Sequence, residues 1–341
     1  MTGDLLMGDF NHKCLLCGAE SVLSGCTRGY FEPDIFNIYH CPSCGSAYSS
    51  PRVDTSAIYN QIYNLGKELH GYHRYYFYKE AVKKKKHPLQ FLVQQEETYW
   101  GAITALQELT FKKNDAKILE VGCGMGFLSY ALIREGYDAT GLDISQNAVN
   151  QAISTYGNHY VCADLKDFSK TQKDFDVIIL TEVIEHIKNP VDFLQTALGM
   201  LKPEGALIVT TPNKSIYSDK VVWFTDLPPV HCWWFSEKSL EYIANRIDAN
   251  IHFIDFTDFY RTKTTYFVVD EQLSLPHFFN SDGKINYKIS RKDKIRCKLL
   301  SVIPSFVVTS YRKIKYRSRK NLYKGGKRGN VICAIFKPQI E

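Results

Sequence analysis

From residue 116 onward, the chain alternates between short apolar runs and longer segments with helical periodicity. Such alternation is typical of βαβ units, in which parallel strands form a sheet that helices cover on both faces. The run 175–180 is almost wholly apolar, as expected of a strand that is buried on both sides. We therefore predict an α/β fold with a seven-stranded sheet, its strands at 117–121, 139–144, 159–162, 175–180, 206–211, 251–256 and 331–336.

Two helices between the later strands have recognisable ends. One is expected from Pro190 to Leu201, with a connection at Lys202–Gly205 before the next strand. The other is expected to begin after Ser236, whose hydroxyl can accept a hydrogen bond from an N–H group of the first turn. It should end near Arg246.

Residues 51–115 are predicted to be helical and are rich in tyrosine, with Tyr59, Tyr63, Tyr72, Tyr75, Tyr76 and Tyr78 close together. Two interpretations stay open: a cap over a ligand pocket, or helices that pack an N-terminal module onto the sheet. The chain then divides into an N-terminal module (1–50), the helical segment (51–115), the sheet core (116–264), an insertion (265–330) and the last strand with the C-terminus (331–341).

The N-terminal module contains two Cys-x-x-Cys pairs, each followed by glycine and separated by 23 residues. The four cysteines are Cys14, Cys17, Cys41 and Cys44. Each pair can form a knuckle that directs two thiolates at one ion, and four thiolates complete a closed tetrahedral zinc site. We predict a structural zinc ribbon whose stability comes largely from the metal, because the segment has little core of its own. Cys26 lies between the pairs and is expected to pack.

Charge is unevenly distributed along the chain. The net charge is +6, but the segment 284–328 holds 16 Lys and Arg residues against a single acid, Asp293. A basic segment on an acidic body suggests a polyanionic partner. The segment is basic, then apolar, then basic again, which suits an anionic membrane surface. It could equally follow a nucleic-acid backbone or pack on the sheet as an amphipathic helical pair.

The chain is expected to be cytoplasmic, with peripheral attachment to a membrane left open. Residues 1–9 lack the positive region and long apolar core of a signal peptide. The longest apolar stretch, Leu299–Thr309, is too short to cross a bilayer. In a reducing compartment, paired cysteines hold metal more often than they form disulfides, and the chain has ten cysteines.

A glycine-rich turn connects the first core strand to a helix. Glu120 ends the strand, and Gly122, Gly124 and Gly126 alternate with Cys123 and Met125 before the helical pattern begins. Glycines allow the backbone to approach a ligand, and N–H groups at the helix start point toward it. Ligands of open α/β sheets lie at the carboxyl ends of strands. Asp143 and Asp164 follow the next two strands and could hold a ribose and an adenine amino group, although these features alone also fit NAD.

The motifs in their order resemble those of the class I S-adenosylmethionine-dependent methyltransferases, which have a Rossmann-like sheet. They are Glu120–Gly126, Gly141–Ser145, Cys162–Asp164, Phe175–His186 and Leu201–Gly205. The resemblance implies that Gly122, Cys123, Gly124 and Gly126 wrap the amino-acid part of the donor, with Glu120 just before them. It also implies that Asp143 holds the ribose with Ile144 beside it, that Asp164 lies at the adenine end, and that Thr181 lines the pocket.

The acceptor side is expected around Glu182, Glu185 and His186, which would share one side of a helical turn, and around His231 further along. This pattern is similar to that of ubiquinone-biosynthesis O-methyltransferases and small-RNA terminal 2′-O-methyltransferases. In those families such residues hold a divalent ion, Mg²⁺ or Mn²⁺, that gathers two neighbouring hydroxyls. Two alternatives stay open: a histidine that acts as a metal-free general base, or a histidine that only packs the turn.

A zinc ribbon before a methyltransferase core also resembles sugar C-methyltransferases of deoxysugar pathways and enzymes of surface-polysaccharide synthesis. We therefore expect a methyltransferase that acts on a hydroxyl of a saccharide or lipid-linked small molecule. RNA 2′-O-methylation and methylation of a sugar carbon are the alternative reactions. A binding module that kept the fold without activity is the non-enzymatic alternative, and the intact glycines and Asp143 argue against it.

Overall fold

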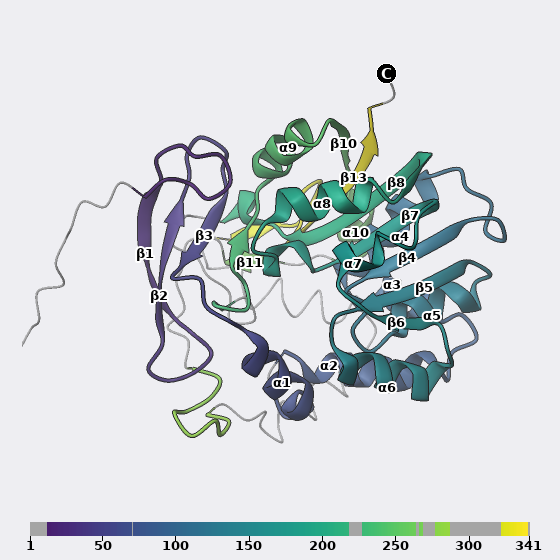
Figure 1. The fold of residues 1–341 in the computed structure, drawn as a ribbon, viewed down its shortest axis with the longest axis horizontal. Coiled ribbons are helices and arrows are strands. Elements are labelled where there is room, and N and C mark those ends of the chain that lie inside the picture. Colours follow the sequence, from purple (N-terminus) through teal and green to yellow (C-terminus); the bar gives the residue numbers. More distant parts are fainter. Residues whose placement is uncertain are drawn as a thin grey trace, which may run out of the picture.

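The computed structural model describes residues 12–69, 71–217, 227–263, 266–268, 277–286 and 322–339. A small sheet near the N-terminus lies on one side of a larger sheet, and the first two helices after the small sheet lie toward the bottom of the view (Figure 1). The larger sheet has seven strands in the order β10-β13-β8-β7-β4-β5-β6. Their bounds are β4 (Lys117–Val121), β5 (Asp138–Asp143), β6 (Tyr160–Cys162), β7 (Phe175–Thr181), β8 (Leu201–Pro212), β10 (Ala249–Phe253) and β13 (Val331–Pro338).

The prediction of a seven-stranded α/β sheet is confirmed. The strands β6, β5, β4, β7 and β8 run parallel to one another, whereas β13 is antiparallel to both β8 and β10. The last strand therefore enters between two strands that precede it in the sequence. This order places the carboxyl ends of β4, β5, β7 and β8 along one edge, where a ligand site is expected.

Several predicted boundaries were wrong, and the helix expected to reach Leu201 ends at Leu198. The stretch Lys202–Gly205 belongs to β8, which already begins at Leu201. The register against β7 shifts between Phe175 and Val177, and this irregularity accommodates the extra residues of β8. The strand expected over 251–256 ends at Phe253, because Phe256 is the N-cap of the next helix, α10 (Thr257–Thr262).

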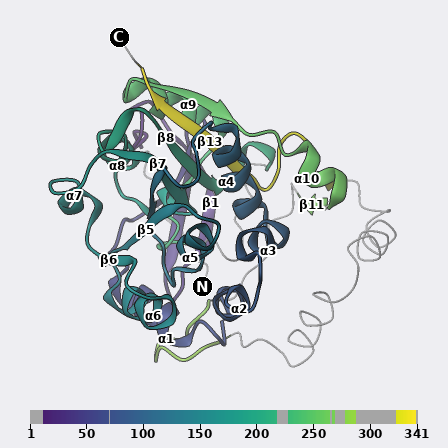
Figure 2. The ribbon, with the colours of Figure 1, turned by 90° about the vertical axis from the view of Figure 1, so that its right-hand side faces the viewer.

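Helices cover both faces of the large sheet (Figure 2). Alternate strand residues point to opposite faces. Leu119 therefore packs with one helix layer, whereas its neighbour Ile118 packs with the other. The first layer contains α7 (Leu165–Phe168), α8 (Pro190–Leu198) and α9 (Glu237–Arg246), and the second contains α3 (Pro88–Gln95), α4 (Glu97–Glu108) and α5 (Phe127–Arg134). The remaining core helix, α6 (Gln146–Tyr156), packs beside β6.

The predicted helix that starts after Ser236 is confirmed, with Ser236 as its N-cap. The Ser236 hydroxyl accepts from the backbone N–H of Ser239, and the Ser239 hydroxyl accepts from the backbone N–H of Ser236. This reciprocal pair forms a capping box, which satisfies two N–H groups at the helix start. The two residues before this cap, Trp234 and Phe235, therefore lead directly into a well-defined helix start.

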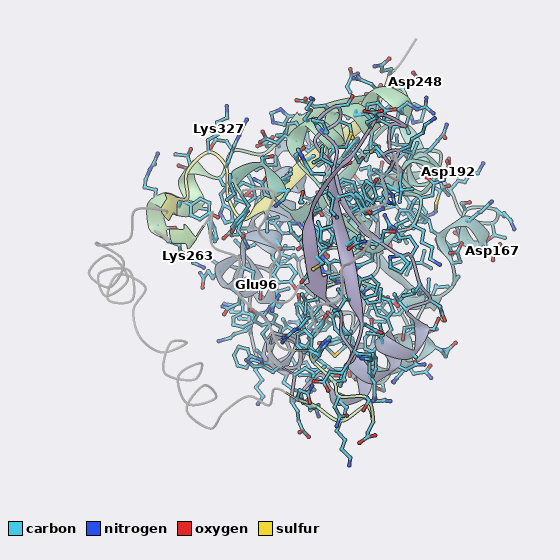
Figure 3. All side chains as sticks on the ribbon, turned by 90° about the vertical axis from the view of Figure 1, so that its left-hand side faces the viewer. Glu96, Asp167, Asp192, Asp248, Lys263 and Lys327 are labelled. Carbon is cyan, nitrogen blue, oxygen red and sulfur yellow. The ribbon has the colours of Figure 1, made fainter. Side chains whose placement is uncertain are left out.

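The small sheet has the order β1-β2-β3-β9 and is antiparallel throughout. Its strands are β1 (Val22–Arg28), β2 (Ile35–His40), β3 (Ala47–Ser50) and β9 (Trp233–Trp234). Figure 3 views the molecule from the side of this sheet, with β1 and β2 toward the viewer. The fourth strand comes from far along the chain, so the N-terminal module of 1–50 shares its sheet with the core. Cys26 was expected to pack, but it is exposed on β1.

The helical segment after the ribbon contains α1 (Ser56–Leu65), α2 (His73–Val82), α3 and α4. Its contacts agree with helices that pack the ribbon onto the core, whereas a cap over a ligand pocket stays a prediction. Tyr75 of α2 stacks on Phe127 at the start of α5, with ring centroids 6.4 Å apart. Tyr72 reaches the other way, because its hydroxyl lies 2.5 Å from that of Tyr30 beside the small sheet. The helices therefore lie against the glycine turn and also join the ribbon to the core.

Most of the basic segment 284–328 lies outside the described residues. The described part of the insertion packs on the ribbon, where Phe278 stacks on Tyr30 and His277 Nδ1 lies 3.0 Å from the Gly29 carbonyl oxygen. Another part forms the pair β11 (Tyr266–Val268) and β12 (Leu322–Lys324). Lys263 and Lys327 lie on the opposite side of Figure 3 from Asp167, Asp192 and Asp248.

Among the described residues, we find no helix with the length and apolar character needed to cross a bilayer.

Candidate active site

The glycine turn lies between β4 and α5, at the carboxyl edge of the sheet. Gly122 has a φ of 75°, in the left-handed region that favours glycine. A Cβ at this position would lie 2.6 Å from Val183 Cγ2, so the turn has no space for a side chain here. The N–H groups of Gly122 and Cys123 donate to the Leu142 carbonyl at 2.7 and 3.1 Å. The turn is thereby fixed against β5 before any ligand binds.

Asp143 ends β5 and is almost fully buried beside the turn. Its Oδ2 accepts from the Gly124 N–H at 2.8 Å, and its Oδ1 accepts from the Ser145 N–H at 2.8 Å. Burial raises the pKa of Asp143, and these two hydrogen bonds act in the opposite direction. Each carboxylate oxygen keeps a further lone pair. The side chain can therefore accept from two neighbouring hydroxyls, as the ribose of the expected donor requires.

Glu120 lies on β4, just before the turn, and its side chain reaches Ser129 of α5. Its carboxylate accepts a hydrogen bond from the Ser129 hydroxyl, and only 3% of the residue is exposed. Burial raises the pKa of Glu120 to about 7. Glu120 therefore supports the turn from the protein interior. We expect it to affect donor binding less directly than Asp143 does.

The adenine end of the expected donor site is open. Ile144 follows Asp143 and is 73% exposed. Asp164 is exposed at the start of α7, where its Oδ1 accepts from the Lys166 N–H at 2.8 Å. An exposed apolar side chain and an accepting carboxylate match the face and the amino group of an adenine.

Thr181 and Glu182 end β7 at the same edge. Glu182 has a φ of 55°, an uncommon conformation for a residue with a side chain. Its N–H group donates to the Thr210 carbonyl at 3.1 Å, and its Oε1 accepts from the Thr210 hydroxyl at 3.0 Å. Interactions with β8 therefore hold Glu182 in this left-handed conformation.

Three of the four predicted acceptor-side residues come together. Glu185, His186 and His231 each offer a ligand atom, and these atoms lie within 4.8 Å of one another. Glu182 is not part of this group, because it precedes the 3₁₀ turn at Ile184–His186 and is held by Thr210. The expectation that Glu182, Glu185 and His186 share one side of a helical turn was therefore wrong for Glu182.

The geometry of the cluster defines which atoms are available for chemistry. His186 Nδ1 lies 2.8 Å from the Val230 carbonyl oxygen, so this nitrogen carries the proton in the neutral ring. His186 Nε2 then presents its lone pair, 3.8 Å from Glu185 Oε1. The rings of His186 and His231 meet edge to face, with centroids 4.5 Å apart. Burial lowers the pKa of His231 to about 3, so this ring is neutral at physiological pH.

Sequence reasoning missed the residues that orient the cluster. Glu185 is fully buried, and its Oε2 accepts from the Thr211 hydroxyl at 2.9 Å. Thr211 and its neighbour Thr210 are themselves buried at the end of β8. The available signal was the pair of successive threonines at the end of an apolar strand. Polar side chains at the carboxyl end of such a strand lie at the edge where ligands bind.

Two tyrosines of α1 lie next to the glycine turn and His186. The Tyr63 hydroxyl lies 3.9 Å from the place where a Cβ on Gly124 would stand, and the Tyr59 ring meets His186 edge-on at 6.3 Å. Burial raises the pKa of both phenols, with Asp143 contributing in each case. Both hydroxyls are therefore neutral and can donate a hydrogen bond at any physiological pH.

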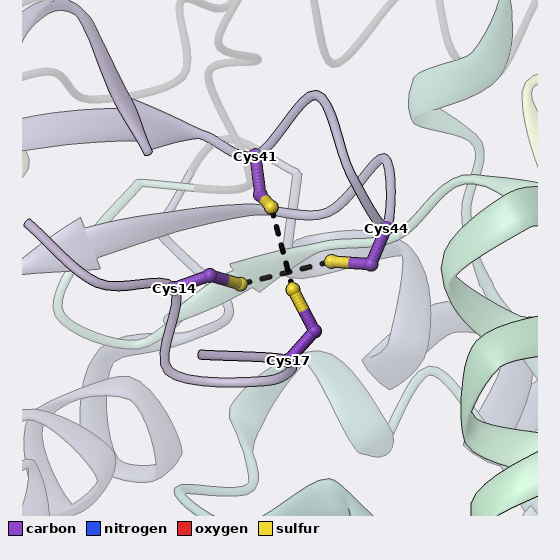
Figure 4. Close-up of side chains that lie close together, drawn as sticks. All are labelled: Cys14, Cys17, Cys41 and Cys44. Carbon is purple, nitrogen blue, oxygen red and sulfur yellow. Dashed lines mark hydrogen bonds between the residues drawn. The ribbon is translucent and has the colours of Figure 1, made fainter. Parts of the chain in front are cut away.

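The four predicted ribbon cysteines converge on one point (Figure 4). Their sulfur atoms all lie within 4.8 Å of one another, with Cys14–Cys44 at 3.6 Å and Cys17–Cys41 at 3.5 Å. A zinc tetrahedron with bonds of about 2.3 Å has sulfur–sulfur edges of about 3.8 Å. The residues fit a structural zinc ion.

Comparison with known proteins agrees with the site. Residues 94–252 match the model of a family described as a methyltransferase domain. The chain is similar to the ubiquinone biosynthesis O-methyltransferase of Coxiella burnetii (strain RSA 331 / Henzerling II), with 28% identity over 160 residues. The match covers 46% of this chain and 61% of that protein, so the chain spans about three fifths of the length of this relative.

Two solved structures are also similar. One is a SAM-dependent methyltransferase from Archaeoglobus fulgidus, with 14% identity and a TM-score of 0.41 over 71% of this chain and 95% of that chain. The other is the plantazolicin methyltransferase BpumL in complex with SAH, with 17% identity and a TM-score of 0.40 over 77% of this chain and 100% of that chain. The strand order and the glycine turn agree with the family match, and we conclude that residues 94–252 carry a methyltransferase domain with the fold of the class I S-adenosylmethionine-dependent enzymes.

Proposed function

We propose that the protein transfers a methyl group from S-adenosylmethionine to a hydroxyl of a saccharide or lipid-linked small molecule. The observation that carries this proposal is the cluster of Glu185, His186 and His231, because it includes the loop whose Val183 contacts the donor turn. Val183, in the same loop, lies against Gly122 of that turn. A group held at the cluster therefore faces the place where the reactive methyl would lie. Relatives that are named O-methyltransferases support oxygen as the methylated atom.

The reaction asks little of the protein beyond alignment and the removal of one proton. The acceptor oxygen forms a bond to the methyl carbon while the bond from that carbon to sulfur breaks, which leaves S-adenosylhomocysteine. Holding the two reactants in line contributes a large part of the rate. The acceptor proton needs a base, and the lone pair of His186 Nε2 is positioned to take it.

The same three residues fit a divalent ion. One carboxylate and two imidazoles leave coordination positions open for substrate oxygens, and His186 is oriented by its second nitrogen, as metal-binding histidines commonly are. Two imidazoles favour Mn²⁺ or Zn²⁺ over Mg²⁺. Such an ion would lower the pKa of a bound hydroxyl and would favour an acceptor with two neighbouring hydroxyls.

Calorimetry with S-adenosylmethionine tests the donor, and labelled donor tests the acceptor. We expect binding to the purified protein and then methyl transfer to a panel that pairs each vicinal diol with its single-hydroxyl analogue. Stimulation by Mn²⁺ and a preference for diols would assign the ion, whereas equal activity in a chelator would assign His186 as base. No donor binding would overturn the proposal, and transfer to carbon would revise the methylated atom.

RNA 2′-O-methylation is the second candidate, and the 16 basic residues of 284–328 favour it. Contacts with phosphates release counterions, so RNA binding should weaken steeply with salt. If RNA is the acceptor, deletion of this segment should abolish salt-sensitive binding and methyl transfer to RNA together. Retention of transfer to a saccharide after the deletion would decide for the first proposal.

A further inference from the structure

We propose that the cysteine ribbon is a positioning device for the acceptor-side histidines. Closure of the four-cysteine site would fix β9, and β9 would fix both His231 and the turn that carries His186. The inference rests on the proposed function only in assigning these histidines to the acceptor site. It concerns Cys232 and Trp233, which link the two sites without belonging to either.

The strand β9 lies at the junction of the ribbon and the active site. On the ribbon side it pairs with β3, with Trp233 opposite Tyr48 and Trp234 opposite Ala47. The pairing continues one residue further, because the Ser49 N–H donates to the Cys232 carbonyl at 3.2 Å. The strand β3 begins three residues after Cys44, and β9 begins two residues after His231. Both Cys44 and His231 therefore lie within a few residues of the paired strands β3 and β9.

On its other side, the same segment holds the loop after β7. The Cys232 N–H donates to the Glu185 carbonyl at 2.9 Å, and the Cys232 thiol donates to the same oxygen at 3.3 Å. The Trp233 indole N–H donates to the Ile187 carbonyl at 2.9 Å. The residues on both sides of His186 are thus anchored to the strand that follows His231.

The metal-binding knuckle also contacts the helix that follows β9. Lys238 of α9 donates to the Pro42 carbonyl at 3.0 Å. Gly45 packs so closely against Ser236 that a Cβ would lie 2.6 Å from the hydroxyl oxygen. Arg52, just after β3, places its guanidinium 4.6 Å from the centre of the Trp233 ring. The ribbon therefore contacts β9 and the residues on both sides of it.

The ribbon sheet packs one apolar face, with Ile38 and Trp234 buried, but the outer ends of its strands are exposed. Val22, Leu23 and Ile35 of β1 and β2 are 60%, 55% and 63% exposed. A strand of two residues such as β9 is also too short to be stable without a partner that is itself held in place. Loss of the ion should release β3, and β9 would then lose the ladder that aligns His231.

Hydrogen exchange measured by mass spectrometry on the full chain tests this role. The comparison is between the zinc-loaded protein, the chelator-treated protein and the variant Cys44→Ser, with Cys26→Ser as the matched control because Cys26 is an exposed ribbon cysteine outside the metal site. We expect zinc in the wild-type and control proteins. After loss of zinc, amide exchange at 230–234 and 184–187 should become roughly tenfold faster, as expected when about one hydrogen bond per amide is weakened. Exchange at 117–126 should not change.

The variant Trp233→Phe tests the link without removing the metal. It keeps an aromatic ring beside Arg52 but removes the indole donor to Ile187. We expect retained zinc and faster exchange confined to 184–187. Unchanged exchange there, a protein that binds no zinc, or zinc loss that affects only residues 12–50 would overturn the positioning role.

Failure of this inference can be distinguished from failure of the proposed function. S-adenosylmethionine affinity is measured in the same samples, and we expect it to stay within about twofold after zinc removal, because the donor turn is fixed by β5. Loss of donor binding together with faster exchange at 117–126 would mean general unfolding and would overturn the inference. Absence of donor binding in the intact wild-type protein would count against the proposed function alone.

Discussion

Val183 packs on Gly122 so closely that a Cβ at Gly122 would lie 2.6 Å from its Cγ2 methyl. One residue belongs to the donor turn after β4, and the other belongs to the acceptor loop after β7. Since β4 and β7 are neighbours in the sheet, their carboxyl ends meet at one point of the edge. The donor and acceptor halves of the site are therefore in direct contact.

The substitution Gly122→Ala should abolish most donor binding. Alanine at a φ of 75° is strained, and its methyl would displace Val183. We expect the dissociation constant for S-adenosylmethionine to rise at least about tenfold, since the left-handed conformation alone costs roughly 1–2 kcal/mol. Calorimetry measures this dissociation constant. Gly199→Ala, in an ordinary helical conformation with a closest contact of 3.5 Å, is the control and should bind as the wild type does.

Asp143→Asn should weaken donor binding with a smaller effect on the fold. The amide has one accepting oxygen, so the N–H of either Gly124 or Ser145 would lose its acceptor, and a ribose would lose charge-assisted bonds. We expect affinity for S-adenosylmethionine to fall about 10- to 100-fold. The variant Asp167→Asn, at an exposed carboxylate of α7, should leave affinity unchanged. Equal affinity of the Asp143→Asn protein would contradict the assignment of Asp143.

Ile144→Ser should weaken donor binding without reducing stability. The side chain is 73% exposed, so its removal costs little folding energy, but an adenine stacked on it would lose apolar contact. We expect roughly tenfold weaker binding by calorimetry and an unchanged melting temperature. Ile35→Ser, at a 63% exposed isoleucine of the ribbon, is matched in chemistry and exposure. Weaker donor binding in both variants would mean that exposure, and not the position of Ile144, was responsible.

Thr211→Val should impair metal binding at the acceptor cluster. The substitution keeps the shape of the side chain but removes the hydroxyl that donates to Glu185 at 2.9 Å. We expect Mn²⁺ affinity, measured by electron paramagnetic resonance, to fall about 10- to 100-fold, as is common when a residue that orients a metal ligand is lost. The control variant Thr196→Val removes a hydroxyl that donates to a backbone carbonyl of α8, and it should leave the Mn²⁺ affinity unchanged. Identical Mn²⁺ binding by all three proteins would argue against a metal at this cluster.

Glu120 should make the protein less stable as the pH rises toward neutrality. Burial raises its pKa from 4.5 to about 7 in the folded protein, so the folded state binds a proton more tightly than the unfolded state. Its stabilising contribution is complete below pH 4.5 and is lost as the pH rises through 7. The loss is about 3 kcal/mol at 1.36 kcal/mol per pKa unit.

Urea denaturation between pH 4.5 and 8 tests this effect. Glu120→Gln keeps an acceptor for the Ser129 hydroxyl but cannot ionise, so the decrease in the free energy of unfolding should become shallower. Part of the decrease should remain, because burial also raises the pKa of Glu97 to about 7. Asp138→Asn, at the exposed start of β5, serves as the control. A slope that is identical in wild type and Glu120→Gln would contradict the prediction.

Local sequence alone determined the elements and the donor half of the site. The strand at 117–121 has the bounds that its apolar run predicts, and Ser236 caps α9 as expected. The glycine turn and the position of Asp143 at the end of the next strand were equally visible. The two cysteine pairs predicted a cluster that the structure confirms as four converging sulfurs. These features depend on residues close together along the chain, where hydrophobic periodicity, capping and turn chemistry act.

Only the tertiary structure decided the acceptor half. His186 meets the Val230 carbonyl across 44 residues of sequence, and Thr211 reaches Glu185 across 26. Whether such residues meet depends on the order of strands in the sheet and on the path of the loop before β9. The position of Glu182 outside the cluster likewise follows from its bonds to Thr210 on a neighbouring strand, which no local pattern encodes.

The ribbon is the clearest case of this division. Its cysteines could be found from their spacing, but its fourth strand, Trp233–Trp234, carries no local signal of belonging to it. A two-residue strand is formed by its partner and not by its own sequence, because so short a segment gains too little from pairing to order itself. The sequence therefore determined the four-cysteine cluster and the methyltransferase core. The tertiary structure decided that they share a strand next to His231.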